Sequence, residues 1–238
     1  MQQRASASRA ISQRGNGLLR IDMHVHSSYS RDSVIPVKTI FRFWKLSGII
    51  PLVCDHDTLE GSNRVMRAIH AENPDIPKIL AEEITSSDGE IIGLFLNEEI
   101  PPGLSAAETL DVIHGQGGLS LVPHPFSAYR SKVLRAATRN ALVNEIDLVE
   151  GHNARNASDE EDRLAVVFAA EMGIPFTAGS DAHTTLELGR VFMEVPPFDG
   201  PRALLRGIAG APFTFRRMNR GIHLVTGVVK RVRETTGQ

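Results

Sequence analysis

The sequence has few cysteine and aromatic residues, and almost no excess of charge of either sign. Cys54 is the only cysteine in 238 residues, which excludes an intrachain disulfide and favours a reducing compartment such as the cytoplasm. A formal net charge of −2 gives no support for a nucleic acid or an acidic membrane as the main partner. No apolar run approaches the roughly 20 residues of a membrane-spanning helix, so we expect no membrane association.

The N-terminal residues 1–17 are rich in Arg, Ser and Gln, contain no acidic residue and lack the apolar segment of a secretory signal. We expect them to form a disordered leader. Residues 18–238 have the length of one large α/β or barrel domain. We expect this single domain to include a C-terminal amphipathic helix at 221–234, which packs its apolar side on the sheet.

Short apolar runs alternate with amphipathic stretches along the domain, which predicts βαβ units and a mainly parallel sheet, open or closed into a barrel. The expected strands are residues 18–23, 48–54, 77–83, 91–96, 118–123, 145–151, 174–179 and 191–196. The expected helices are residues 37–48, 61–72, 105–116 and 158–173. Ser158 and Glu161 predict a capping box at the start of the last helix, and Gly173 predicts its end.

Histidine and carboxylate residues gather where the expected strands end. Because the carboxyl ends of parallel strands meet at one rim, residues distant in sequence are expected to form one cluster. A single buried histidine is more often a core residue than a ligand, but so many polar groups at one rim would be costly without a shared cation. The residues in question are His24, His26, Asp55, His56, Asp57, Glu82, Glu83, His124, Asp181 and His183.

The ligand types indicate a catalytic centre. Imidazole nitrogen combined with carboxylate oxygen, and without thiolate, suits zinc, manganese or iron. The candidates exceed what one tetrahedral ion can use, which predicts two to three divalent ions with a bridging carboxylate. His70, His114 and His223 lie inside expected helices, and we assign them no role in the site.

The motifs DMHVHSSYSRDS, CDHD, AEEITS, VPHPF and GSDAH occur in an order that resembles the PHP (polymerase and histidinol phosphatase) family. The resemblance covers about residues 19–195. It implies an α/β fold, a distorted (β/α)7 barrel, and a trinuclear metal site. It also implies a stand-alone phosphoesterase that hydrolyses a phosphate mono- or diester by a metal-bound hydroxide. The expected partner is a small phosphorylated substrate, nucleotides included, without a stable nucleic-acid complex.

The resemblance also implies a ligand set for each ion. The first ion is assigned to His24, His26, Glu83 and Asp181. The second shares Glu83 and adds His124, and the third takes His56 and His183 with Asp32. Where the family usually supplies another histidine, the chain has Glu90, which would favour a harder ion such as manganese. Glu82 and Glu83 face opposite sides of a strand, so only one of them reaches the centre, and the family pattern favours Glu83.

Residues beside the ligands receive supporting roles. Asp22 is expected to accept a proton from the second ring nitrogen of a ligand. Three residues are candidates for proton transfer, and the two aspartates among them could instead support the metal ligands. Three further residues are candidates for contact with phosphate. The proton-transfer candidates are Asp55, Asp57 and His152, and the substrate-binding candidates are, in order of preference, Arg155, Arg130 and Asn153.

Two alternative functions remain open at this point. The first is a metal hydrolase of the amidohydrolase type, whose barrel also opens with HxH. The DH pair after the second strand argues against it, and so does the lack of a strand-end lysine, since Lys38 and Lys45 lie in a helix. The second is a non-catalytic PHP module, which the near-complete ligand set disfavours. The sequence leaves the oligomeric state open.

Overall fold

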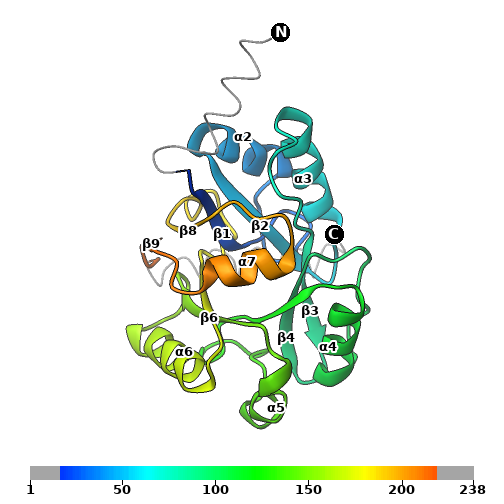
Figure 1. Cartoon of the computed structure of the whole chain (residues 1–238), viewed down its shortest axis with the longest axis vertical. Helices are drawn as coiled ribbons and strands as arrows, with labels where there is room; N and C mark the ends of the chain where they lie inside the picture. Colours follow the sequence, from blue (N-terminus) through cyan, green and yellow to red (C-terminus); the bar gives the residue numbers. More distant parts are fainter. Residues whose placement is uncertain (1–16, 219–238) are drawn as a thin grey trace.

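The computed structural model describes residues 17–218, in which one sheet curves around the chain's core and helices cover its outside (Figure 1). Most of the expected leader, and the helix expected at 221–234, lie outside the described residues, and both stay predictions. In the part of the chain that the structure describes, no helix combines the length and apolarity needed to cross a membrane.

The sheet runs in the order β7-β6-β5-β4-β3-β2-β1-β8-β9. The end of β7 returns to the end of β1: the Asp181 amide donates to the His24 carbonyl at 2.7 Å, and the His26 amide donates to the Ala182 carbonyl at 2.9 Å. The result is a nearly closed barrel. The strands are β1 (Leu19–Val25), β2 (Ile49–His56), β3 (Ala81–Ser86), β4 (Gly89–Leu94), β5 (Leu119–Val122), β6 (Leu148–Asn153), β7 (Phe176–Gly179), β8 (Val191–Val195) and β9 (Phe213–Phe215).

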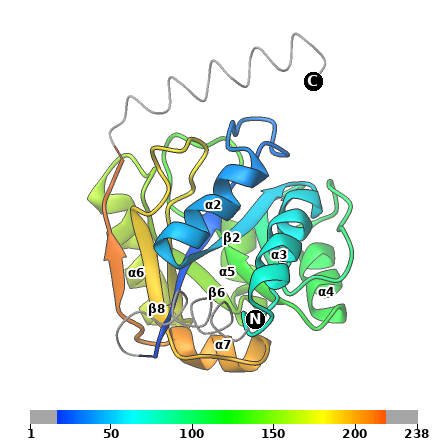
Figure 2. The same ribbon diagram turned by 90° about the horizontal axis from the view of Figure 1, so that it is seen from above.

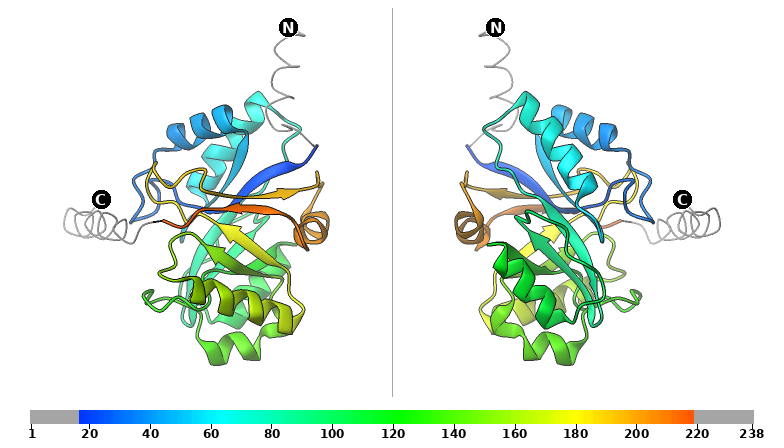
Figure 3. Two further views of the ribbon diagram at one scale, coloured as in Figure 1. Left: turned by 90° about the vertical axis from the view of Figure 1, so that its left-hand side faces the viewer. Right: turned by 90° about the vertical axis from the view of Figure 1, so that its right-hand side faces the viewer.

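The helices lie around the outside of the barrel, and β8 and β9 extend the sheet beyond β1 (Figures 2 and 3). The sequence predicted the four longest helices to within a residue or two of their ends but not α5, α7 or β9. The helices are α2 (Val37–Ser47), α3 (Glu60–Glu72), α4 (Ala106–Gly115), α5 (Ala136–Ala141), α6 (Asp159–Met172) and α7 (Pro201–Ile208), with a short 3-10 turn η1 (Val143–Glu145).

The expectation of a mainly parallel sheet is only half right. β1–β2, β2–β3, β5–β6 and β6–β7 pair parallel, whereas β3–β4, β4–β5, β1–β8 and β8–β9 pair antiparallel. β3 and β4 form a hairpin, because the turn between them leaves no room for a crossover helix. β4 therefore starts at the rim where the parallel strands end, which brings Glu90 to the same edge as Glu83.

Strand β1 illustrates why this sequence forms a barrel wall. Successive side chains point to opposite faces, so Ile21 and Met23 join the apolar core on one face, and Asp22 and His24 lie on the other. All four are fully buried. A strand covered on both faces needs polar partners for its inner side chains, and the barrel interior supplies them.

Helix α6 begins at Ser158, whose hydroxyl accepts from the Glu161 amide, and ends at Gly173 in the left-handed conformation, as predicted. The predicted reciprocal contact is wrong, because the Glu161 carboxylate accepts from the Ala157 amide. A complete capping box stands instead at the start of α4, between Ser105 and Glu108.

Candidate metal centre

Four buried side chains bring donor atoms together where β1, β3 and β7 end, and we call them the first cluster. His24 and His26 leave β1 on the same side, with their Nε2 atoms 3.0 Å apart. Glu83 Oε2 lies 3.5 and 3.2 Å from these two nitrogens, and Asp181 Oδ1 lies 3.6 and 3.4 Å from them. None of these side chains is more than 1% exposed.

The hydrogen bonds behind the first cluster show that it suits a cation. His24 Nδ1 lies 3.0 Å from the Glu150 carboxylate, which fixes the ring proton on Nδ1. His26 Nδ1 donates to the Ser30 hydroxyl at 2.9 Å, because that hydroxyl donates its own proton to Asp55. The Nε2 atoms of both rings therefore face each other and two carboxylates. Ligands around a tetrahedral zinc ion are about 3.4 Å apart, close to these separations.

The second cluster shares Glu83 and adds His124 and Glu90. His124 Nε2 lies 3.3 Å from Glu83 Oε1 and 3.9 Å from Glu90 Oε2. His56 Nδ1 lies 3.2 Å from Glu83 Oε2 and 3.7 Å from Glu90 Oε1. Burial, together with the charge of Glu83, raises the pKa of Glu90 to about 7. Two carboxylates this close repel each other, and a cation between them would remove the repulsion.

The third cluster lies at the outer side of the other two and contains His183, His56 and Asp32. His183 Nδ1 contacts the Asp181 carbonyl at 2.7 Å, and a carbonyl only accepts, so the ring proton is on Nδ1. Burial and the charge of Arg155 lower the pKa of His183 to about 3, which keeps the ring neutral. Its Nε2 lone pair then faces Asp32 Oδ1 at 3.2 Å, and His56 Nε2 lies 3.6 Å from Asp32 Oδ2.

All nine side chains predicted to bind metal thus fall into three adjoining clusters. Two overlapping groups, His26–His56–His183 and His56–Glu83–Glu90, have one donor atom of each member within 4.8 Å of the others. The ligand roles themselves stay predictions. As expected for neighbours on a strand, Glu82 faces away from Glu83, and its Oε2 accepts from the Ile100 amide.

The ring nitrogen of His24 is held by Glu150 and not by Asp22, contrary to the role predicted for Asp22. Asp22 Oδ1 instead accepts from the Ser180 amide at 2.9 Å and so ties β1 to the end of β7. Glu150 was not among the residues predicted from the sequence. A carboxylate inside a short apolar strand was the available signal, and it is the same signal that drew attention to Glu83.

Asp55 and Asp57 have different surroundings. The Asp55 carboxylate is fully buried and accepts from the Ser27 amide and hydroxyl, both at 2.6 Å, and from Ser30. It therefore supports His26 through Ser30 and is not placed for proton transfer. Gly61 faces this carboxylate so closely that a Cβ there would lie 1.8 Å from it. Asp57 borders the open cavity, and its Oδ1 accepts from the Thr85 amide.

A bulge in β6 turns the side chains of Glu150 and His152 to opposite sides of the strand. The register shifts between Glu150 and His152, so Glu150 points inward while His152 packs against Phe213 and Phe215, with ring centroids 4.7 and 5.2 Å apart. His152 thus packs among aromatic rings, and its role in proton transfer stays a prediction. Asn153 also points inward, but it is buried and donates to Glu150 and Asp181, so it is not placed to bind substrate.

The two arginines predicted to contact phosphate have different surroundings. Arg155 is 6% exposed, and its Nε lies 3.3 Å from Glu187 Oε1, away from the cavity. Glu187 in turn accepts from the His183 amide at 2.9 Å and the Thr184 amide at 2.7 Å. The pair therefore fixes the loop that carries His183. Arg130 instead stands at the centre, where its guanidinium contacts the Asp181 carboxylate.

A cavity of about 220 Å³ opens over the second and third clusters. Asp32, His56 and Glu90 reach it from the clusters, and basic side chains stand on its wall. Lys132 Nζ lies 3.8 Å from Glu90 Oε1. The lining residues are Arg31, Asp32, His56, Asp57, Glu90, Tyr129, Arg130, Ser131 and Lys132.

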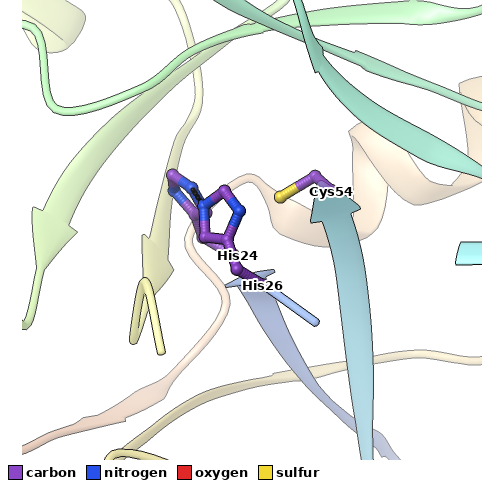
Figure 4. A group of neighbouring side chains, drawn as sticks. All are labelled: His24, His26 and Cys54. Atoms are coloured by element: carbon purple, nitrogen blue, oxygen red, sulfur yellow. Dashed lines mark hydrogen bonds between the residues drawn. The ribbon is translucent and has the colours of Figure 1, made fainter. Parts of the chain in front are cut away.

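Cys54 also lies beside the first cluster. It precedes His56 by two positions on β2, is fully buried, and points toward the imidazoles of His24 and His26 (Figure 4). One donor atom of each of these three residues lies within 4.8 Å of the others. No ligand role was predicted for Cys54 from the sequence.

Comparison with known proteins places this geometry in a family. The PHP-associated family matches residues 159–210. An uncharacterized protein of Methanocaldococcus jannaschii is 33% identical over 179 residues, which cover 74% of this chain and 70% of that protein. A Bacteroides vulgatus two-domain structure, described as containing a predicted PHP-like metal-dependent phosphoesterase, has a TM-score of 0.64 at 15% identity. The chain belongs to the PHP family.

Membership of the PHP family confirms the resemblance drawn from the five motifs, and the α/β barrel confirms the fold expected from it. A second uncharacterized protein of M. jannaschii is 34% identical over 159 residues, which cover 62% of this chain and 90% of that protein. The match to the B. vulgatus structure covers 84% of this chain and 66% of that two-domain chain.

Proposed function

We propose that this PHP chain is a hydrolase that cleaves phosphate mono- or diesters with two to three divalent ions. The observation that carries the proposal is the convergence of five imidazoles and four carboxylates beneath one cavity with basic walls. Such a donor set is hard to explain as structure alone, because it leaves acceptor atoms facing one another in a buried place.

Each ion has a set of residues that would hold it. The first cluster offers four donors with tetrahedral spacing, the second offers His124 and Glu90 with Glu83 as the bridge, and the third offers His56, His183 and Asp32. Bound ions would supply Lewis-acid polarisation of the phosphoryl group and a nucleophile at neutral pH. The mixture of imidazole and carboxylate fits zinc, manganese or iron.

The chain's own cations would bind the phosphoryl oxygens. Arg130 is 22% exposed at the cavity wall, and its planar fork of N–H donors matches the spacing of phosphate oxygens. Lys132 adds a second positive charge on the same wall. Asp57 is the lining carboxylate that none of the three clusters uses, and we assign it proton exchange with the leaving group.

The cavity limits the substrate. A volume of about 220 Å³ is below the usual range of pockets for drug-sized ligands, about 300–1,000 Å³, and suits a phosphoryl group with a small alcohol. Larger leaving groups, such as a nucleoside, would extend past Tyr129, whose side chain is 78% exposed at the edge of the cavity. We therefore propose small phosphorylated compounds, nucleotides included, as substrates.

The test is a substrate panel with the purified full-length chain, stripped of metal and reloaded with manganese or zinc. The panel contains aryl phosphate monoesters, aryl phosphate diesters, nucleotides and an N-acyl amide. We expect metal-dependent turnover of at least one phosphate ester. Turnover of the amide alone would favour an amidohydrolase activity, and no turnover by a fully loaded chain would contradict the proposal.

A substitution links the activity to the centre. Asp181→Asn removes the charge of one first-cluster carboxylate at nearly constant size, and we expect it to reduce turnover by at least about 100-fold. The matched control is His114→Asn, which removes an imidazole bonded to Asp147 outside the centre and should leave turnover unchanged. Equal activity of Asp181→Asn and the unmodified chain would place the reaction elsewhere.

A further inference from the structure

Cys54 reaches the first cluster from the neighbouring strand. Val53 pairs with Val25, so Cys54 lies beside His26 across the β1–β2 ladder. Cys54 is fully buried, and its thiol, a weak donor, donates to the Val25 carbonyl at 3.8 Å. The thiol points at the two imidazoles of β1 (Figure 4).

A second observation marks the same point as a cation position. Asp181 Oδ1 is buried and has no hydrogen-bond partner among the described residues, yet it lies 3.6 and 3.4 Å from the Nε2 atoms of His24 and His26. Those two Nε2 atoms lie 3.0 Å apart. The two imidazoles of β1 thus have the Asp181 carboxylate and the Cys54 thiol as buried neighbours.

We propose that Cys54 is a metal ligand of the first cluster and makes this position prefer zinc over manganese. Thiolate is a soft ligand, which zinc accepts readily, whereas manganese prefers carboxylate and water. The thiol would lose its single proton as the metal–sulfur bond forms, so only the ion at the first cluster would release a proton from Cys54. The proposal rests on the metal centre described under Proposed function.

The direct test is X-ray absorption on the unmodified chain loaded with zinc. A sulfur scatterer at about 2.3 Å, added to nitrogen and oxygen at about 2.0–2.1 Å, is the expected result. Zinc bound with nitrogen and oxygen neighbours alone would overturn the role of Cys54 and leave the metal centre standing. A chain that retains no zinc, manganese or iron would overturn the metal centre itself, and with it this proposal.

Cobalt substitution gives a second readout that does not depend on turnover. Because Cys54 is the only cysteine, a thiolate-to-cobalt charge-transfer band in the near ultraviolet can arise only from it. We expect the band in the unmodified chain, and its loss in Cys54→Ser with the visible cobalt bands retained. The same band in Cys54→Ser, or visible bands without it in the unmodified chain, would overturn the proposal.

The metal preference is measured by competition between zinc and manganese. We expect Cys54→Ser and Cys54→Ala to lower the ratio of zinc to manganese affinity by about 10-fold or more, since the soft donor is lost. His114→Asn is the control and should keep the ratio of the unmodified chain. An unchanged ratio in both Cys54 variants would overturn the proposal.

Discussion

Replacing Glu82 by Gln tests how far the barrel wall penalises a buried charge. The Glu82 side chain is fully buried, one oxygen accepts from the Ile100 amide, and the other has no hydrogen-bond partner among the described residues. Burial raises the pKa of Glu82 from 4.5 to about 7. A difference of about 2.5 units, at about 1.4 kcal/mol each, corresponds to about 3 kcal/mol between the two protonation states.

The sign of the pH dependence follows from which state binds the proton. Between pH 4.5 and about 7 the folded chain holds the Glu82 proton while the unfolded chain releases it. The free energy of unfolding therefore falls as the pH rises through this window, and Glu82→Gln removes that fall. The amide adds a buried donor that costs about 1–2 kcal/mol at every pH, so the variant is destabilised near pH 4.5 and stabilised by about 1–2 kcal/mol at pH 8.

The assay is urea unfolding of the protein, after a chelator has removed bound metal, at several pH values between 4.5 and 8. At each pH, the unfolding free energy of Glu82→Gln is compared with that of the unmodified chain. This difference should change by about 3 kcal/mol between pH 4.5 and 8, and the constant cost of the amide does not affect that change. Glu98→Gln, on the exposed loop after β4, is the control and should give a difference that does not vary with pH. A Glu82→Gln difference that is flat across the range would refute the reasoning.

Three further outcomes follow from the site. Glu150→Gln should weaken metal binding by about 10–100-fold in competition titrations, because His24 loses its charged acceptor; equal affinity would contradict this. Arg130→Met should raise KM for phosphate esters, whereas Arg155→Met should chiefly lower the melting temperature, and the reverse pattern would restore Arg155 as the phosphate contact. His152→Ala should keep kcat while costing about 1–3 kcal/mol of unfolding free energy through lost packing, and a large loss of kcat would return it to catalysis.

The residues that the sequence revealed are those that follow a strand at the rim. His24, His124 and Asp181 could be found because strand ends meet at one edge whatever the path of the chain between them. The residues that it missed or misplaced depend on local irregularities. The bulge in β6 turns His152 outward, and the residue types around it do not predict such a bulge.

The antiparallel course of β4 had a similar effect. The apolar run predicts a strand at residues 91–96 but not its direction, and the position of Glu90 depends on the direction. The role of Arg155 was equally hidden, because its partner Glu187 lies in a loop more than thirty residues away and follows no motif. Contacts between loops are decided by packing, which a single sequence does not display.

The closure of β7 onto β1 completes the first cluster. Backbone hydrogen bonds bring His24 on β1 next to Asp181 after β7, although more than 150 residues separate them in the sequence. The first cluster therefore exists only in a closed barrel. Ions that bound only the closed barrel would add about 2.7 kcal/mol to its stability at one hundred times their Kd. Metal content would thus report whether the barrel has shut, and a chain cut before β7 should hold no ion at this position even if its first strands fold.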